Sequence, residues 1–363
     1  MGAFEGATDA RGAVPWHTAS PRRAALVALL VLALVAGAVV GLRVWRADAG
    51  SPARAGWAGA LALLPADTTV VGFTDWAAVR AASLDEPGDR DVLTRSVLAD
   101  EERLEEVLGW TGSDVATETY AQSPTSVSLV IEPSGASGVG AMADVLAAAG
   151  WRERADGTLT IDSADLAALG LSDVLTFVRP LPERGVLVAS PIELGVDAVV
   201  DVAAGRAPSL TSVRAALDVA RALSGAHSAL LQAGTLACES TAVADPAAAD
   251  QVDVAQERAG RLIDYAFSGR AVTDRGGPID DPRAQRVRFA MAFESVGTAR
   301  EQARVRAALA QGPFIGRTGQ VEDLVRLQDS EVTGSAAVLT FDRAPGDGAL
   351  MTGTGPLLFA ACP

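Results

Sequence analysis

The feature that most constrains this sequence is an apolar run from Ala24 to Leu42, AALVALLVLALVAGAVVGL. The run contains no charged or strongly polar residue, and as a helix it would extend ~28 Å, close to the hydrocarbon thickness of a bilayer. Arginines flank it on both sides, at Arg22, Arg23, Arg43 and Arg46. The run predicts one transmembrane helix over residues 24–42, with the lipid bilayer as its partner, between a disordered tail (1–23) and a linker (43–57).

Orientation does not follow from the flanking charges, because the arginines are balanced on the two sides of the run. Three other features favour a cytoplasmic N-terminus and an extracytoplasmic body. The N-terminal flank is short, and long domains translocate largely regardless of charge. The net charge of −15 falls on the body, since residues 1–49 carry five arginines against three acidic residues. Both cysteines, Cys238 and Cys362, lie in the body, as expected for one disulfide in an oxidising compartment.

Two alternatives for the apolar run stay open. Ala47-Asp48-Ala49 has the form of a signal-peptidase site, so the segment would then be cleaved after Ala49. The run is longer than the usual ~7–15 residues of a signal peptide, and two arginines separate it from that site, which favours a retained anchor. The pair Arg22-Arg23 also resembles the start of a twin-arginine signal.

Composition excludes several kinds of chemistry. The chain contains neither Lys nor Asn, and all thirty basic residues are Arg, which suggests a GC-rich bacterial genome. A Schiff-base lysine, a P-loop lysine and an N-glycosylation site are therefore impossible. The only histidines are His17, in the tail, and His227, so a two-histidine metal site in the body is excluded. The acidity of the body argues against nucleic acid as a partner, because nucleic-acid binding needs a basic surface.

The periodicity of the body predicts an α+β fold with a mixed sheet, organised as two related α/β halves over residues 58–208 and 209–363. Strands are predicted at 68–74, 125–131, 158–161, 175–178, 185–190, 228–232, 265–272, 287–294, 336–341 and 357–360. Helices are predicted from Trp76, with Thr74 or Asp75 as the cap, and at 92–108, 139–149, 191–204, 211–223, 246–262 and 298–310.

No residue pattern in the body carries a specific chemical signal. Asp67 and Asp75 are ~26 Å apart along an extended strand, too far for a glycosidase pair. The glycines at 135, 138 and 140 have the wrong spacing for a dinucleotide loop. His227 beside a strand is expected to be half-buried or exposed. We therefore predict no catalytic, cofactor-binding or metal-ligating residue, and only the structural disulfide Cys238–Cys362.

Four segments of the body resemble a set of actinobacterial membrane-anchored proteins of unknown function. They are LLPADTTVVGFTDWAAVR, Cys238 after its strand, RFAMAFESVGTAREQARVRAALAQGP, and the ending GPLLFAACP. The LPADT opening is also similar to a broader group of anchored bacterial domains of unknown function. The resemblance implies a single-pass anchor, an exterior α+β domain and one disulfide, and it implies no activity, ligand or catalytic residue.

Two functions from different classes follow from these observations. The first is a non-catalytic protein of the cell envelope whose exterior body binds a protein, a wall component or a small ligand. The second is a hydrolase of cell-wall material, which would need two carboxylates at glycosidase spacing in a cleft, one of them with a raised pKa. A sensor that signals through the helix is a third and weaker hypothesis, because residues 1–23 hold no recognisable output module.

Overall fold

The computed structural model describes residues 56–82, 101–135, 138–243, 245–274, 285–316, 318–323, 325–343 and 357–363. Residues 51–363 form one compact unit. The predicted tail (1–23), the predicted transmembrane helix (24–42) and the linker up to residue 55 lie outside the described residues. Within the ranges that are described, none of the helices is long and apolar enough to cross a membrane.

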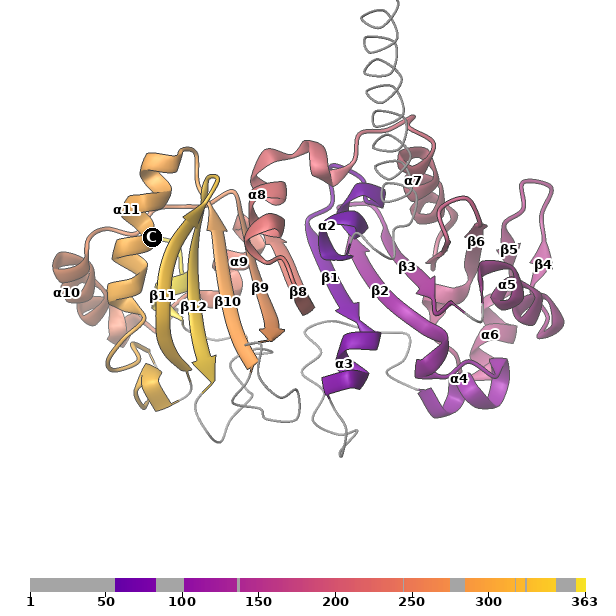
Figure 1. Cartoon of the computed structure of the whole chain (residues 1–363), viewed down its shortest axis with the longest axis horizontal. Helices are drawn as coiled ribbons and strands as arrows, with labels where there is room; N and C mark the ends of the chain where they lie inside the picture. Colours follow the sequence, from indigo (N-terminus) through magenta and orange to yellow (C-terminus); the bar gives the residue numbers. More distant parts are fainter. Residues whose placement is uncertain are drawn as a thin grey trace, which may run out of the picture. The chain divides into compact units, whose positions relative to one another are not determined.

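The described body contains one sheet of twelve strands in the order β11-β12-β10-β9-β8-β1-β2-β3-β7-β6-β5-β4 (Figure 1). The bounds are β1 Val70–Asp75, β2 Val115–Gln122, β3 Val127–Pro133, β4 Arg152–Glu153, β5 Leu159–Thr160, β6 Phe177–Leu181, β7 Val186–Ser190, β8 Ala226–Ala233, β9 Phe267–Asp274, β10 Gln285–Ala292, β11 Val325–Thr333 and β12 Ala336–Arg343. Every pair of neighbouring strands is antiparallel.

The fold is therefore α+β, as predicted, but the prediction of a mixed sheet is wrong. Three strands were not predicted, the two-residue β4 and the longer β2 and β11, and the error comes mainly from the two longer ones. Both are rich in polar residues (VATETYAQ and VRLQDSEVT), so neither resembles a buried strand. Without these strands, a helix alone would connect two parallel strands. Each extra strand reverses the direction of the chain, so the neighbouring strands are antiparallel.

The strand order repeats on the two sides of the central β1–β8 pair. One side reads β1-β2-β3-β7-β6 and the other reads β8-β9-β10-β12-β11. On both sides, three strands that are consecutive in the chain are also neighbours in the sheet. A later hairpin, β6–β7 or β11–β12, then adds to this group, and the second strand of the hairpin pairs with the third strand of the group. The first side carries the additional short strands β5 and β4 at its outer edge.

Helices cover both faces of the sheet. Their bounds are α2 Gly56–Ala60, α3 Trp76–Ala82, α4 Glu101–Leu108, α5 Gly138–Ala148, α6 Ser163–Leu169, α7 Glu193–Ala203, α8 Arg214–Ala222, α9 Gly234–Thr241, α10 Ala249–Ala259 and α11 Val296–Leu309. On one face α2, α7 and α8 share a single core with side chains such as Phe73 and Val130. One further core lies beneath α3 to α6, another lies beneath α9 and α11, and a small one joins α10, α11 and residues 357–363.

Most predicted helix ends agree with the structure for local reasons. Asp75 caps α3 as predicted, since its Oδ1 accepts a hydrogen bond of 2.9 Å from the amide of Ala78. Ser295 caps α11 in the same way through the amide of Thr298, at 3.1 Å. Of the helix predicted over 92–108, residues 92–100 lie outside the described residues, and α4 begins at Glu101.

The segment around the predicted boundary at residue 208 is bonded to the start of β1. The amide of Ala66 donates to the Pro208 carbonyl at 3.1 Å, and the amide of Leu210 donates to the Leu64 carbonyl at 2.8 Å. A short bridge between Pro65 and Ser209 accompanies these bonds. The division of the body at residue 208 remains a prediction.

The last predicted strand, residues 357–360, is wrong. This stretch contains a single turn of 3-10 helix, Leu358–Ala360. Its backbone carbonyls accept hydrogen bonds from the buried side chains of Arg306, Tyr265 and Thr241 instead of from a neighbouring strand. Buried carbonyls in a strand receive their hydrogen bonds from a neighbouring strand. Here side chains donate those hydrogen bonds, so the segment does not have to be extended.

Candidate functional site

The structure joins Cys238 and Cys362 in a disulfide, as the sequence predicts, with 5.2 Å between the Cα atoms. Cys238 lies on α9, whose position depends on Gly234 at its first residue. A Cβ atom at Gly234 would lie 2.0 Å from the carbonyl oxygen of Tyr265, so only glycine allows the start of α9 to approach the loop before β9 this closely. The disulfide therefore links α9 to the segment that contains Cys362.

Residues 357–363, which we call the clamp segment, are held by buried side chains as well as by the disulfide. Nη1 of Arg306 donates to the carbonyls of Phe359 and Ala361, at 2.9 Å each. The Tyr265 hydroxyl and Oγ1 of Thr241 both donate to the Ala360 carbonyl, at 2.8 and 3.1 Å. Three consecutive carbonyls of the clamp segment thus find their donors in side chains from α11, from α9 and from the loop before β9.

Arg306 on α11 is completely buried, and backbone carbonyls take the place of a carboxylate partner. Its Nη2 donates to the Ile263 carbonyl at 2.9 Å, and its guanidinium lies 5.3 Å from the ring centre of Tyr265 and 5.4 Å from that of Phe293. Burial lowers the pKa of Arg306 to about 10, while Tyr265 and Asp264 act in the opposite direction. The guanidinium is therefore charged at neutral pH.

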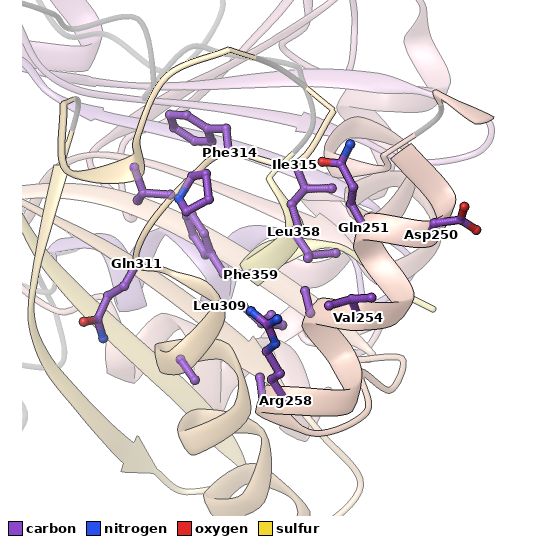
Figure 2. A pocket seen from close by; sticks show the side chains of 15 residues that line it. Asp250, Gln251, Val254, Arg258, Leu309, Gln311, Phe314, Ile315, Leu358 and Phe359 are labelled. Atoms are coloured by element: carbon purple, nitrogen blue, oxygen red, sulfur yellow. The ribbon is translucent and has the colours of Figure 1, made fainter. Parts of the chain in front are cut away.

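A pocket of about 540 Å³ lies between α10, the end of α11 and the clamp segment (Figure 2). This volume is within the range of small-molecule sites in proteins, ~300–1,000 Å³. Eleven of the fifteen lining residues are apolar, and they include Phe314 and Ile315 from the loop after α11 and Leu358 and Phe359 from the clamp segment. The arrangement suits a hydrocarbon or aromatic group.

Small side chains on α10 account for the space. Val254, Ala255 and Ala259 line the pocket from α10. Of all the residues of this helix, only Ala259 is buried. Helix α4 lies between β1 and β2 in the chain, as α10 lies between β8 and β9. In contrast to α10, helix α4 buries Leu104 and Leu108 in the core. Because α10 offers no large apolar side chain, the gap between α10 and α11 stays open and Val254 remains 44% exposed.

Four polar residues lie around the pocket, namely Asp250, Gln251 and Arg258 on α10 and Gln311 after α11. In Figure 2 the side chain of Arg258 extends toward Leu309, across the gap from α10. Asp250 points away from the apolar lining in the same view. Arg258 is thus the charged side chain best placed to meet a ligand in this pocket.

A glycosidase would need two carboxylates in a cleft, one of them with a raised pKa. The Glu132 carboxyl has the raised pKa but does not lie in a cleft. Glu132 on β3 is buried, and burial raises its pKa, with a hydrogen bond of 3.1 Å from the Thr117 hydroxyl acting against this and the charge of Asp75 adding to it. The cavity beside Glu132 measures about 10 Å³, which is too small for a sugar ring. Asp75 is also engaged as the cap of α3. The Glu132 carboxyl therefore lies in packed structure, and the cavity beside it does not admit a sugar.

A change of Glu132 to Gln is expected to stabilise the protein at neutral pH. The pKa of Glu132 is higher in the folded than in the unfolded chain, so the stability that its neutral form contributes is present at low pH and is lost as the pH rises through the folded-state pKa. Glu132→Gln keeps the size of the side chain and cannot ionise. Urea unfolding of both proteins should give a higher midpoint for the variant at pH 7.5 and equal midpoints near pH 4. Equal midpoints at both pH values would contradict the assignment.

The described residues contain one cluster with the spacing of metal ligands, made of Cys238, Asp264 and Cys362. Both sulfur atoms are consumed by the disulfide, so the oxidised protein offers only the Asp264 carboxylate there. His227 is half-buried, within the range that the sequence predicts. The glycine loop leads into α5, which begins at Gly138 as an ordinary helix.

Sequence reasoning missed Arg306 and the pocket for different reasons. Arg306 occupies the buried face of α11 together with Ala299, Gln302 and Ala303, whereas Arg300 and Arg304 are exposed as expected. A charged residue in register with an apolar helical stripe is the signal that could have found it. The pocket had no such signal, because its residues come from four separate segments.

Comparison of the chain with protein-family models, with curated proteins and with solved structures finds no significant match.

Proposed function

We propose that this chain is a membrane-anchored protein of the cell envelope whose body binds a small apolar ligand in the α10–α11 pocket. The pocket carries the proposal: about 540 Å³ of space with a mainly apolar lining, built by two helices and the clamp segment. Burying a hydrocarbon there would contribute ~25 cal/mol for each Å² of apolar surface removed from water. No chemistry beyond binding is needed to account for these residues.

The location in the envelope rests on two features. The apolar run 24–42 has the length of a single membrane span and is bordered by arginines. The disulfide Cys238–Cys362 supports an oxidising compartment for the body, since such bonds are rare in the cytoplasm. Together they favour a cytoplasmic N-terminus and an extracytoplasmic body. The proposal also admits an envelope protein or a wall component as a further partner.

We also infer that the two halves of the body arose by duplication. The observation behind this is the repeated strand order on the two sides of β1 and β8. In both halves the third strand is followed by a helix, α5 or α11, and a later hairpin returns to it, with β4, β5 and α6 inserted before that hairpin in the first half. The ligand pocket would then be an addition to the second half, where α10 packs loosely.

Filling the pocket is expected to abolish binding. Ala255 is half-buried in the pocket wall, and Ala255→Trp would place an indole in the space that a ligand needs. The measurement is photolabelling of the full chain in native membranes with a diazirine-bearing analogue of dodecanol, followed by peptide mapping. We expect label on peptides from α10, on residues 307–315 and on the clamp segment, with at least a ten-fold loss in Ala255→Trp.

Ala147→Trp is the matched control, because Ala147 is an exposed helical alanine on α5, remote from the pocket in the chain. It should label like the unchanged protein. Absence of label from the pocket peptides in the unchanged protein would overturn the proposed function, as would equal labelling of the pocket in the Ala255→Trp variant.

A further inference from the structure

The two ends of the pocket differ in the charged residue that α10 places there. Asp250 and Arg258 are eight residues apart on this helix, which corresponds to ~12 Å along its axis. The two charges therefore lie at opposite ends of the pocket. Figure 2 shows that they differ in direction as well, since Arg258 extends toward Leu309 and Asp250 points away from the lining. One end of the pocket thus presents a cation to a ligand, and the other end presents no anion.

A second guanidinium lies near the cationic end. Nη1 of Arg304 on α11 donates to the carbonyl of Ala259, the last residue of α10, at 3.2 Å. Arg304 is four residues before Ala308, a lining residue, and residues at this spacing share one face of a helix. Two arginines from different helices therefore flank the same corner of an apolar pocket.

The local charges run against the charge of the whole protein. A chain with a net charge of −15 repels anions in general, so anion binding requires cations close to the site. At physiological salt the screening length is about 8 Å, which lets Arg258 and Arg304 dominate the potential at this corner. Guanidinium groups bind carboxylates and phosphates through paired hydrogen bonds.

We propose that the ligand is an amphiphile, a hydrocarbon chain that ends in an acidic head group, with the chain in the apolar pocket and the head group bound by Arg258. This inference rests on the proposed function, since it assigns the chemical class of ligand for the same pocket. Arg304 adds positive potential at the head-group end and already holds the end of α10 in place. A cationic amphiphile is disfavoured, because Asp250 points away from the lining.

The test compares three photoreactive probes that share one twelve-carbon chain: analogues of dodecanoic acid, dodecanol and dodecylamine. Each is applied to native membranes that contain the full chain, and label on the pocket peptides is normalised to label elsewhere on the protein. We expect the acid to label the pocket about five-fold more than the alcohol, and the amine least. This ratio corresponds to about 1 kcal/mol, the scale of a solvent-accessible ion pair.

Arg258→Gln should remove the preference, so that the acid and the alcohol label the pocket of this variant equally. Arg258→Lys should keep part of the preference, since it keeps the charge but not the paired donors. The matched control is Arg261→Gln, which removes the same charge from an exposed residue outside the pocket lining and should change nothing.

The two proposals fail in different ways. If the acid and the alcohol label the pocket equally, and Arg258→Gln has no effect, the assignment of an acidic head group is wrong while the apolar pocket stands. If the amine labels most strongly, the head group has the opposite charge and the assignment is again wrong. If none of the three probes labels the pocket, the proposed function itself fails.

Discussion

Replacing both Cys238 and Cys362 with Ala is expected to lower the free energy of unfolding by about 5 kcal/mol. The bond closes a loop with a sequence separation of 124 residues, and the chain-entropy model gives ~4.7 kcal/mol for a loop of 100 residues. Alanine keeps both positions small and apolar, so the packing of α9 against the clamp segment changes little. The effect therefore comes mainly from the greater freedom of the unfolded chain.

The measurement is denaturant unfolding of the full chain, with the midpoint and the slope determined for both proteins. Treating the unchanged protein with dithiothreitol should reproduce the double variant, and the reductant should leave the double variant unaffected. A loss below about 1 kcal/mol would contradict the prediction. It would mean that Arg306, Tyr265 and Thr241 alone hold the clamp segment.

Replacing Arg306 with Met is expected to cost about 3 kcal/mol. The change leaves the carbonyls of Phe359, Ala361 and Ile263 without their donor, and each unsatisfied buried group costs ~1–3 kcal/mol. Part of this loss is offset, because the variant no longer buries a charge. That burial lowers the pKa of Arg306 to about 10, and a lowered pKa of a base means that the fold disfavours its charged form.

The sign of the pH dependence follows from the same pKa. Between about pH 10 and the ordinary pKa of arginine the unfolded chain binds more protons than the folded chain, so the penalty of the buried charge is relieved only in that range. Below about pH 9 the arginine is charged in both states, and the difference between Arg306→Met and the unchanged protein should not vary with pH. Unfolding midpoints at several neutral pH values test this.

Two further variants make the Arg306 result specific. Arg300→Met changes an exposed arginine on the same helix and should alter stability by less than about 0.5 kcal/mol. Arg306→Lys keeps the charge on a compact ammonium, which cannot reach carbonyls on two separate segments, so most of the loss should persist. Full stability of Arg306→Lys would show that the charge matters and the three hydrogen bonds do not.

How much of the fold the sequence predicts depends on how far each element is buried. Strand β3 (VSLVIEP) and helix α11 were predictable, because one has a continuous apolar run and the other has a helical stripe and a serine cap. Strand β11 was not, because it lies at the edge of the sheet and most of its side chains are exposed. With no pattern of burial along such a strand, only its pairing with β12 defines it.

Strand β2 was missed for another reason. Two of its polar residues, Glu118 and Thr119, are buried, and Glu118 accepts a hydrogen bond of 3.1 Å from the indole of Trp76. A polar residue that is buried with its partner is indistinguishable in sequence from one that is solvated. The same limit applies to the candidate site. The two cysteines could be predicted as a disulfide because their chemistry is specific. The pocket could not be predicted, because it arises from small side chains on α10 that do not fill the space.

The disulfide also sets an order of events for the newly made chain. Cys238 cannot find its partner until the ribosome has passed Cys362, by which time β1 to β12 have all been synthesised. Leu358 and Phe359, which close one side of the pocket, belong to this late segment. One wall of the pocket is thus made after all twelve strands, and its covalent link to α9 forms only where an oxidant is present.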